Sequence, residues 1–258
     1  MHALLNIALR AARDAAEALA HSSDRLDRVK IIDASADTFL TSADRTADKT
    51  VLYHLQKAHP QHSIRSRVSG FIEGGNKDVV WLVDPLLGNK NFSIGYTQFA
   101  VSVACQVDGV VKHAAIVCPL SHDEFTASRG GGAQLNTRRL RVGKSDVVRD
   151  TLISVNSARV EMTDFLHLQQ QLIENGASPR ISGCTAFDMV QTAADRLQGG
   201  WAANEEFSSL AAASLILQEA GGLLGSEAGS PDITSGRELV FGNPRIFKQL
   251  LKMRRAKA

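Results

Sequence analysis

The segment WLVDPLLGNKNF (residues 81–92) decides the fold of this chain. Its apolar first half predicts a buried strand, which delivers the carboxylate of Asp84 at its end. Pro85 and Gly88 then break the strand pattern. A glycine-containing turn at this point can aim backbone N–H groups at an anion, so the segment predicts a polar site where a buried strand ends.

The residues before and after this segment predict helices first and a β-meander next. Apolar side chains at helical spacing predict amphipathic helices over residues 3–20 and about 44–58. Residues 99–120 alternate around Asp108-Gly109, a pair that favours a tight hairpin. Gly130-Gly131-Gly132 is interpreted as a turn, and the basic strand RRLRV (138–142) follows it.

The second half of the chain alternates strands and helices. We expect strands at 152–155 and 238–242, and helices at about 161–174, 184–197, 208–220 and from 244 onward. Asn175-Gly176 stops the first of these helices, and Asn243-Pro244 caps the last. The pattern predicts a layered α/β (α+β) fold in a single unit, with an antiparallel sheet over about 1–145 and a mixed α/β half over about 146–258.

Composition limits the possible functions. Lys plus Arg number 29 against 27 Asp plus Glu, so no global field directs the chain to nucleic acid or an anionic membrane. The three cysteines lie far apart in apolar stretches, which indicates neither a disulfide framework nor a metal site. The N-terminus lacks the pattern of a signal peptide, and no apolar run is long enough to span a bilayer. We expect a soluble protein of the reducing cytoplasm.

The chain resembles the inositol monophosphatase family, and more closely its SuhB-like branch, over nearly its full length. WLVDPLLGNKNF is similar to the family motif WVIDPLDGTTNF. Further similar segments are FLTSAD (39–44), EFTASRGGGAQLNTRRLRV (124–142), GCTAFDM (183–189) and GNPR (242–245). The resemblance implies an alternating αβαβα sandwich, usually a homodimer, and a Mg²⁺-dependent phosphomonoesterase in which carboxylates hold the metal ions and activate a water.

Carried over residue by residue, the resemblance implies a damaged metal site. Asp84 and the backbone carbonyl of Leu86 remain of the metal ligands. Arg67 stands where the family has its metal-bridging glutamate, Leu87 and Ser209 replace two ligand aspartates, and Ala202 replaces the glutamate that contacts the substrate. Asp44 and Asn89 occupy the family's water-orienting positions, the latter in place of threonine. The residues themselves predict no cofactor, and Mg²⁺ is implied by the resemblance alone.

These substitutions predict a pseudoenzyme, catalytically impaired or inactive. The alternative is a Mg²⁺-dependent phosphomonoesterase acting on inositol 1-phosphate with low or re-routed activity. In that case nearby acids would substitute for the lost ligands, the candidates being Glu73, Asp78, Glu205 and Glu206, which otherwise are ordinary surface acids. Asp44 could equally cap the second helix. Arg67, Gly88, Asn89 and Lys90 could bind phosphate without hydrolysing it, or Arg67 and Lys90 could be solvated residues beside a collapsed pocket.

The resemblance also implies partners. SuhB-like proteins join transcription antitermination factors and RNA polymerase on ribosomal RNA operons and support ribosome assembly. Two basic clusters fit such contacts or are merely solvated faces: Arg138, Arg139, Arg141 and Lys144, and Lys248, Lys252, Arg254, Arg255 and Lys257. We expect no membrane association and no direct binding of nucleic acid.

Overall fold

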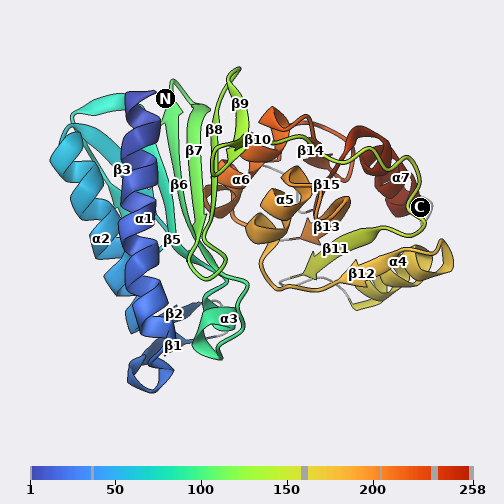
Figure 1. The fold of residues 1–258 in the computed structure, drawn as a ribbon, viewed down its shortest axis with the longest axis horizontal. Coiled ribbons are helices and arrows are strands. Elements are labelled where there is room, and N and C mark those ends of the chain that lie inside the picture. The colour runs from blue at the N-terminus through green and yellow to red at the C-terminus, as the bar shows by residue number, and fades with distance from the viewer. Residues whose placement is uncertain (1, 36–37, 158–161, 204, 234–237, 256–258) are drawn as a thin grey trace.

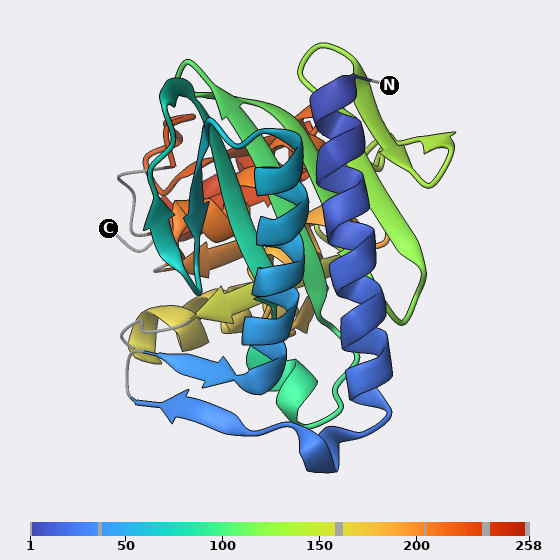
Figure 2. The ribbon, with the colours of Figure 1, turned by 90° about the vertical axis from the view of Figure 1, so that its left-hand side faces the viewer.

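The structure is a computed structural model that describes residues 2–35, 38–157, 162–203, 205–233 and 238–255. Its elements form five layers, alternately helical and sheet-like, which Figure 1 shows from left to right. The predicted αβαβα architecture is confirmed. The N-terminal outer layer consists of α1 (Ala3–Ser23) and α2 (Ser42–Ala58), which pack side by side on one face of a large sheet (Figure 2).

The large sheet has eight strands in the order β10-β9-β8-β7-β6-β5-β3-β4. Their bounds are β3 (His62–Ser66), β4 (Gly70–Ile72), β5 (Asn76–Leu87), β6 (Ala100–Val107), β7 (Val110–Cys118), β8 (Asp123–Ser128), β9 (Gly132–Leu135) and β10 (Arg138–Arg139). The sheet differs from the purely antiparallel one predicted, because β3 pairs with β5 in parallel. The basic strand is also shorter than predicted, since β10 ends at Arg139.

The predicted hairpin at Asp108-Gly109 joins β6 to β7. Both turn residues have positive φ, 51° and 74°, and Val107 faces Val110 across the ladder. Two positive φ angles are what a two-residue turn needs to match the twist of its strands. A small two-stranded sheet, β1 (Ile31–Ala34) and β2 (Phe39–Thr41), connects η1 (Leu26–Arg28) to α2.

The middle layer is formed by α5 (Thr185–Ala193) and α6 (Phe207–Glu219), which contact each other. Side chains of both helices share one apolar cluster with Phe125 of the large sheet and Phe241 of the second sheet. Because both sheets cover it, α6 is buried almost all round, from Ser209 to Leu217. The helix predicted to reach residue 197 ends at Ala193, since Asp195 takes a positive φ of 60° that turns the chain.

The second sheet has the order β12-β11-β13-β15-β14 and mixes parallel with antiparallel pairs. Its strands are β11 (Leu152–Ser157), β12 (Ser178–Arg180), β13 (Gly199–Ala203), β14 (Leu223–Ser226) and β15 (Glu238–Gly242). The C-terminal outer layer is α4 (Met162–Glu174) and α7 (Pro244–Arg255). The predicted start of α4 at residue 161 and the basic residue Lys257 lie outside the described residues.

Two polar contacts fix α7 on the second sheet. Asn243 Oδ1 accepts hydrogen bonds from the backbone N–H groups of Arg245 and Ile246, both 3.0 Å away, which is the predicted N-cap. Near the other end, Arg254 Nε donates to Glu238 Oε2 at 2.5 Å, and Trp201 Nε1 donates to the same oxygen at 2.8 Å. No helix within the described ranges has the length and hydropathy to cross a bilayer.

Candidate functional site

Arg67 is the centre of the polar cluster at the end of β5. It follows β3, and its backbone N–H donates to the carbonyl of Val83 at 3.0 Å. Its guanidinium is largely buried and donates through Nε to Asp84 Oδ1 at 2.8 Å. Nη2 donates to Asp44 Oδ1 at 2.5 Å and to the Leu86 carbonyl at 3.2 Å. One cation therefore bridges two buried carboxylates and a backbone oxygen.

Asp84 and Leu86 reach Arg67 because β5 is irregular there. The pairing of β5 with β6 shifts register between Asp84 and Leu87. The chain then turns through Gly88, whose φ is 71°. A Cβ at this glycine would lie 2.6 Å from the carbonyl oxygen of Gln98, so no other residue fits without displacing that backbone.

Both carboxylate oxygens of Asp44 accept hydrogen bonds. Its Oδ2 accepts from the backbone N–H of Thr41 at 2.8 Å and from the Thr41 hydroxyl at 2.7 Å, and the Thr41 hydroxyl in turn accepts from the Asp44 N–H. This is a capping box at the start of α2. Oδ1 accepts from Arg67 and, at 3.3 Å, from Asn89 Nδ2. The helix-capping role considered for Asp44 is present, together with the bond to Arg67.

Asp84 is equally well supplied with donors. Its Oδ1 accepts from Arg67 and from the backbone N–H of Leu86 at 3.2 Å. Its Oδ2 accepts from the hydroxyl of Ser209, at the start of α6, at 2.6 Å. The middle helical layer therefore contributes directly to the cluster, through a hydrogen bond between residues far apart in the sequence.

The charges in this cluster keep Arg67 protonated. Burial alone would lower the pKa of its guanidinium, but the carboxylates of Asp84 and Asp44 attract and hydrogen-bond the cation, and the net effect raises the pKa. Removing water from opposite charges strengthens their attraction. The guanidinium is therefore a permanent cation held among oxygen atoms.

Of the remaining predicted site residues, Asn89 is bonded to the cluster through Asp44, and the others lie outside it. Leu87 is buried in the apolar cluster shared with α5 and α6. Gly88 precedes the short helix α3 (Asn89–Ser93), and Asn89 Nδ2 also donates to the Phe39 carbonyl at 2.5 Å. Lys90 is exposed, with Nζ 5.9 Å from the centre of the Phe39 ring. Ala202 is buried in β13, within the second sheet.

The nearby acids behave differently from one another. Glu73 is exposed and pairs with Lys77 at 3.7 Å, and Asp78 and Glu206 are exposed as well. Glu205 is close enough to Asp84 and Asp188 for their negative charges to act on its carboxylate. Burial is the main reason that its pKa is raised, with those carboxylates adding to the effect, and it accepts from the Thr185 hydroxyl at 2.5 Å. Within the described ranges, no three or more His, Cys, Asp or Glu side chains form a group that could hold a metal ion.

A further buried carboxylate, Asp188 of α5, had no signal in the sequence beyond its position in GCTAFDM. Its Oδ2 accepts from Ser154, Ser182 and Asn156 at 2.6, 2.6 and 2.7 Å. Burial raises its pKa, and these hydrogen bonds partly oppose that rise. Because the donors come from β11 and the segment before α5, Asp188 ties the second sheet to the middle layer. Nearby Cys184 is buried, and burial raises the pKa of its thiol.

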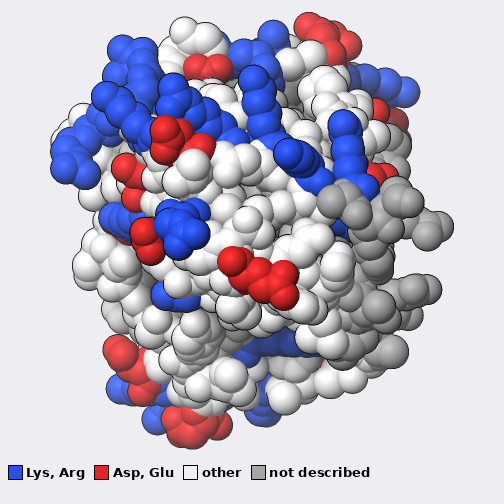
Figure 3. Space-filling model, turned by 90° about the vertical axis from the view of Figure 1, so that its right-hand side faces the viewer, with Lys and Arg blue, Asp and Glu red and all other residues white. Residues whose placement is uncertain are grey.

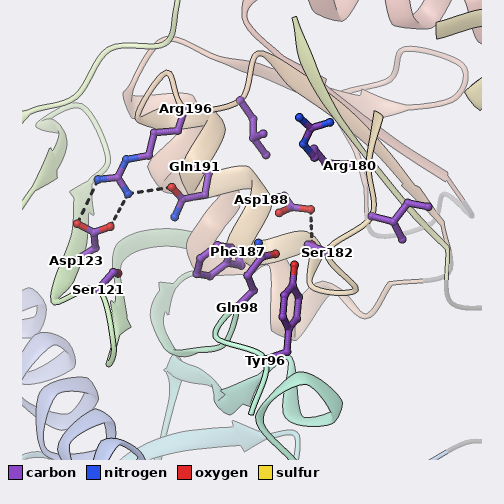
Figure 4. Close-up of a pocket in the computed structure, with 12 residues that line it drawn as sticks. Tyr96, Gln98, Ser121, Asp123, Arg180, Ser182, Phe187, Asp188, Gln191 and Arg196 are labelled. Carbon is purple, nitrogen blue, oxygen red and sulfur yellow. Dashed lines mark hydrogen bonds and ion pairs between the residues drawn. The ribbon is translucent and has the colours of Figure 1, made fainter. Parts of the chain in front are cut away.

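A cavity of about 310 Å³ lies beside Asp188 (Figure 4). Figure 4 shows Tyr96 and Phe187 on one side of it and Arg196 on the other, where the guanidinium bonds to Asp123 and Gln191. None of the residues lining this cavity belongs to the Arg67 cluster. The cavity and the Arg67 cluster are therefore separate places in this chain.

Comparisons with known proteins extend over the full length of the chain. A sequence model of the inositol monophosphatase family matches residues 1–257. The protein named Nus factor SuhB from Pseudomonas aeruginosa is 38% identical, over 97% of this chain and 95% of its own. The extragenic suppressor protein SuhB from Bartonella henselae is 28% identical with a TM-score of 0.96, covering all of both chains. An inositol monophosphatase from Thermotoga maritima, 22% identical, shares the fold with a TM-score of 0.89, over 99% of this chain and 98% of its own.

Proposed function

The chain belongs to the inositol monophosphatase family, and from that premise we propose that it is a SuhB-like pseudoenzyme that acts by binding protein partners. The observation that carries this proposal is the guanidinium of Arg67, bonded to Asp44, Asp84 and the Leu86 carbonyl. A cation built into the chain takes the oxygen atoms that a metal ion would need.

The residues of this cluster do not fit Mg²⁺. The ion requires several oxygen ligands in near-octahedral geometry, including carboxylates that offset its charge. Arg67 engages the carboxylates of Asp44 and Asp84, the Leu87 side chain offers no ligand atom, and the Ser209 hydroxyl donates a hydrogen bond to Asp84. A divalent ion here would also face the positive charge of Arg67, a repulsion of about 8 kcal/mol at 4 Å for an effective dielectric constant near 20. We therefore assign no metal-dependent step to these residues.

Few acceptor sites remain to activate a water, because Asp44 already accepts four hydrogen bonds and Asp84 three. Both oxygens of Asp44 and both of Asp84 already accept hydrogen bonds from protein donors. A general base must reach the proton of the attacking water within hydrogen-bonding distance and have a free lone pair aimed at it. This arrangement supports a stable, non-hydrolysing centre.

Hydrolysis assays test the loss of activity. With inositol 1-phosphate, nucleoside monophosphates and an aryl phosphate, across Mg²⁺ and Mn²⁺ titrations, we expect no metal-dependent turnover by the unaltered chain. The variant Arg67→Glu, Leu87→Asp, Asn89→Thr, Ser209→Asp is expected to gain turnover, because it returns carboxylates to the ligand positions. Arg65→Glu, an exposed change two residues from Arg67, is the control and should gain none.

Metal-dependent hydrolysis by the unaltered chain would contradict the pseudoenzyme and favour the second candidate function, a Mg²⁺-dependent phosphomonoesterase. The observation that favours this alternative is Glu205, a largely buried carboxylate whose charge interacts with that of Asp84. In that case Glu205→Gln should remove the activity, whereas Glu206→Gln, an exposed neighbour, should not.

For the binding role we propose transcription antitermination factors and RNA polymerase as partners, in the cytoplasm, in support of ribosome assembly. The support is the name Nus factor SuhB carried by a relative that matches nearly the whole chain. Size-exclusion chromatography with purified Nus factors and RNA polymerase tests it, and the chain should co-elute with at least one of them. Elution of the chain alone under all conditions would refute the role.

We also propose a homodimer. Its support is the exposed apolar rim of the cavity, where Tyr96 is 43% and Ile181 59% exposed. Light scattering should give twice the chain mass for the unaltered protein and the mass of one chain for Ile181→Glu. Ile31→Glu, an equally exposed change at the small sheet, is the matched control and should leave the mass unchanged. A monomeric unaltered protein would refute the dimer.

A further inference from the structure

The outer face of α7 carries a regular row of cations. Arg245, Lys248, Lys252 and Arg255 are all exposed, at intervals of three, four and three residues. This spacing keeps them on one side of a helix, over a length of about 15 Å. We call these residues the α7 stripe. Figure 3 shows Lys and Arg side chains gathered over the upper part of the face that carries the C-terminal layer, with Asp and Glu more scattered.

In the described part of the chain, no acidic side chain pairs with the middle of the α7 stripe. Arg245 lies 3.4 Å from the exposed Asp146, and Arg255 donates to the carbonyl of Ala228. Lys248 and Lys252 have no ion pair or hydrogen bond with any residue that the structure describes. Arg254 points elsewhere, to Glu238. The unpaired cations therefore remain available to an external anion.

A shallow depression of about 500 Å³ lies along the α7 stripe. Lys248, Lys252 and Arg255 line it together with Leu251, which is half-buried against the C-terminal apolar cluster. Three cations around one aliphatic side chain match a ligand that presents several negative charges around one apolar group. None of the exposed large apolar or aromatic side chains in the described residues lies on α7, so the helix offers no stacking platform for nucleic-acid bases.

We propose that the α7 stripe docks an acidic segment of a partner protein, with an apolar side chain of that segment over Leu251 and its carboxylates on Lys248, Lys252 and Arg255. Carboxylates three or four residues apart on a helical segment lie about 5–6 Å from one another, the same separation as the cations of the stripe. A phosphodiester chain would satisfy the cations but would leave Leu251 without an apolar partner. The inference rests on the proposed partner-binding role and names a surface for it.

Fluorescence anisotropy with defined probes tests this assignment. The first probe is a labelled helical peptide with Glu at intervals of three, four and three residues and a central Leu. The second peptide has Gln in place of that Leu, and the third probe is a labelled single-stranded RNA of equal net charge. The Leu peptide should bind about threefold or more tightly than the Gln peptide, because Leu251 contributes, and its affinity should fall as NaCl rises from about 50 to about 300 mM.

Charge reversal identifies the surface. Lys248→Glu, Lys252→Glu, Arg255→Glu together should weaken binding of the Leu peptide by about tenfold or more. The matched control is Arg45→Glu, Lys49→Glu, Lys57→Glu on α2, an exposed set on the opposite outer layer, which changes the net charge equally and should alter affinity by less than about twofold. Should the reversed stripe misfold by circular dichroism, the Gln replacements at the same positions give the same comparison.

The outcomes separate the two proposals. RNA binding as tight as peptide binding, equal affinity for the Leu and Gln peptides, or equal losses in the α2 control would each overturn the stripe assignment. If the unaltered chain co-elutes with Nus factors or RNA polymerase and the stripe variant does so equally well, the assignment fails while the binding role stands. If the unaltered chain binds none of these proteins, the binding role fails whatever the peptides show.

Discussion

Replacing Arg67 by alanine is expected to lower the free energy of unfolding by about 3–5 kcal/mol, although the residue lies at no apolar core position. The guanidinium is what makes the burial of Asp44 and Asp84 tolerable. Without it, two carboxylates with almost no contact with solvent would lose their shared counter-charge, and the Leu86 carbonyl would lose a donor. The midpoint of thermal unfolding should fall by roughly 10 °C or more for a chain of this size.

Urea and thermal denaturation measure this effect against Arg65→Ala. Arg65 is an exposed arginine of β3, the strand that precedes Arg67, and lies 5.1 Å from the centre of the Phe71 ring; its loss should cost about 1 kcal/mol or less. Adding Asp84→Asn to Arg67→Ala should recover part of the stability, because the cost arises from unpaired charge rather than lost packing. If Arg67→Ala lowers the free energy of unfolding no more than Arg65→Ala does, Arg67 does not stabilise the buried carboxylates as we expect.

Asp188→Ala is expected to cost about 2–4 kcal/mol, since it leaves the donors of Ser154, Ser182 and Asn156 buried without their acceptor. The same change at Asp78, an exposed aspartate of β5, should cost less than about 0.5 kcal/mol. Urea denaturation at neutral pH compares the two. Equal costs would show that the Asp188 hydrogen bonds contribute nothing beyond those made with water.

The ionisation of Asp188 gives this second prediction a pH signature. Burial raises the pKa of the carboxyl in the folded chain, so the folded state binds its proton more readily than the unfolded chain does. The stability that the folded chain gains from protonating Asp188 is therefore fully present below the unfolded pKa of about 4. It is lost as the pH rises through the raised pKa of the folded chain. Relative to Asp188→Asn, the unaltered protein should gain stability as the pH falls from 7 toward 4. A constant difference across that range would contradict the raised pKa.

Local chemistry explains why so much of the fold could be predicted. The Asp108-Gly109 turn and the Asn243 cap are decided by the φ angles and side-chain oxygens of neighbouring residues, which the sequence displays directly. The end of α5 was missed because it depends on the positive φ of Asp195. Aspartate tolerates this conformation, but its presence in a sequence does not predict it.

The site was harder to predict because its bonds join distant parts of the chain. The family resemblance singled out Arg67, Asp84 and Ser209 as positions where metal ligands of the family are kept or replaced. It did not indicate that Arg67 would turn inward to Asp44 and Asp84, or that Ser209 would donate to Asp84. From the sequence, Arg67 was expected either to bind an external phosphate or to be a solvated cation, whereas its guanidinium has internal acceptors. Whether Arg67 bonds to an external anion or to internal carboxylates depends on the three-dimensional positions of distant residues, which the periodicity of the sequence does not predict.

The middle helical layer has a consequence for the order in which the chain is made. The last strand of the large sheet ends at Arg139, but α6, which covers its inner face, begins only at Phe207. A ribosome adding about 5–20 residues per second needs roughly 3–14 s to cross that interval. Throughout it, the face around Phe125 and Ala127 has no helix to cover it and Asp84 has no Ser209. The period in which only the N-terminal half has been made is therefore the one in which this chain most needs a chaperone.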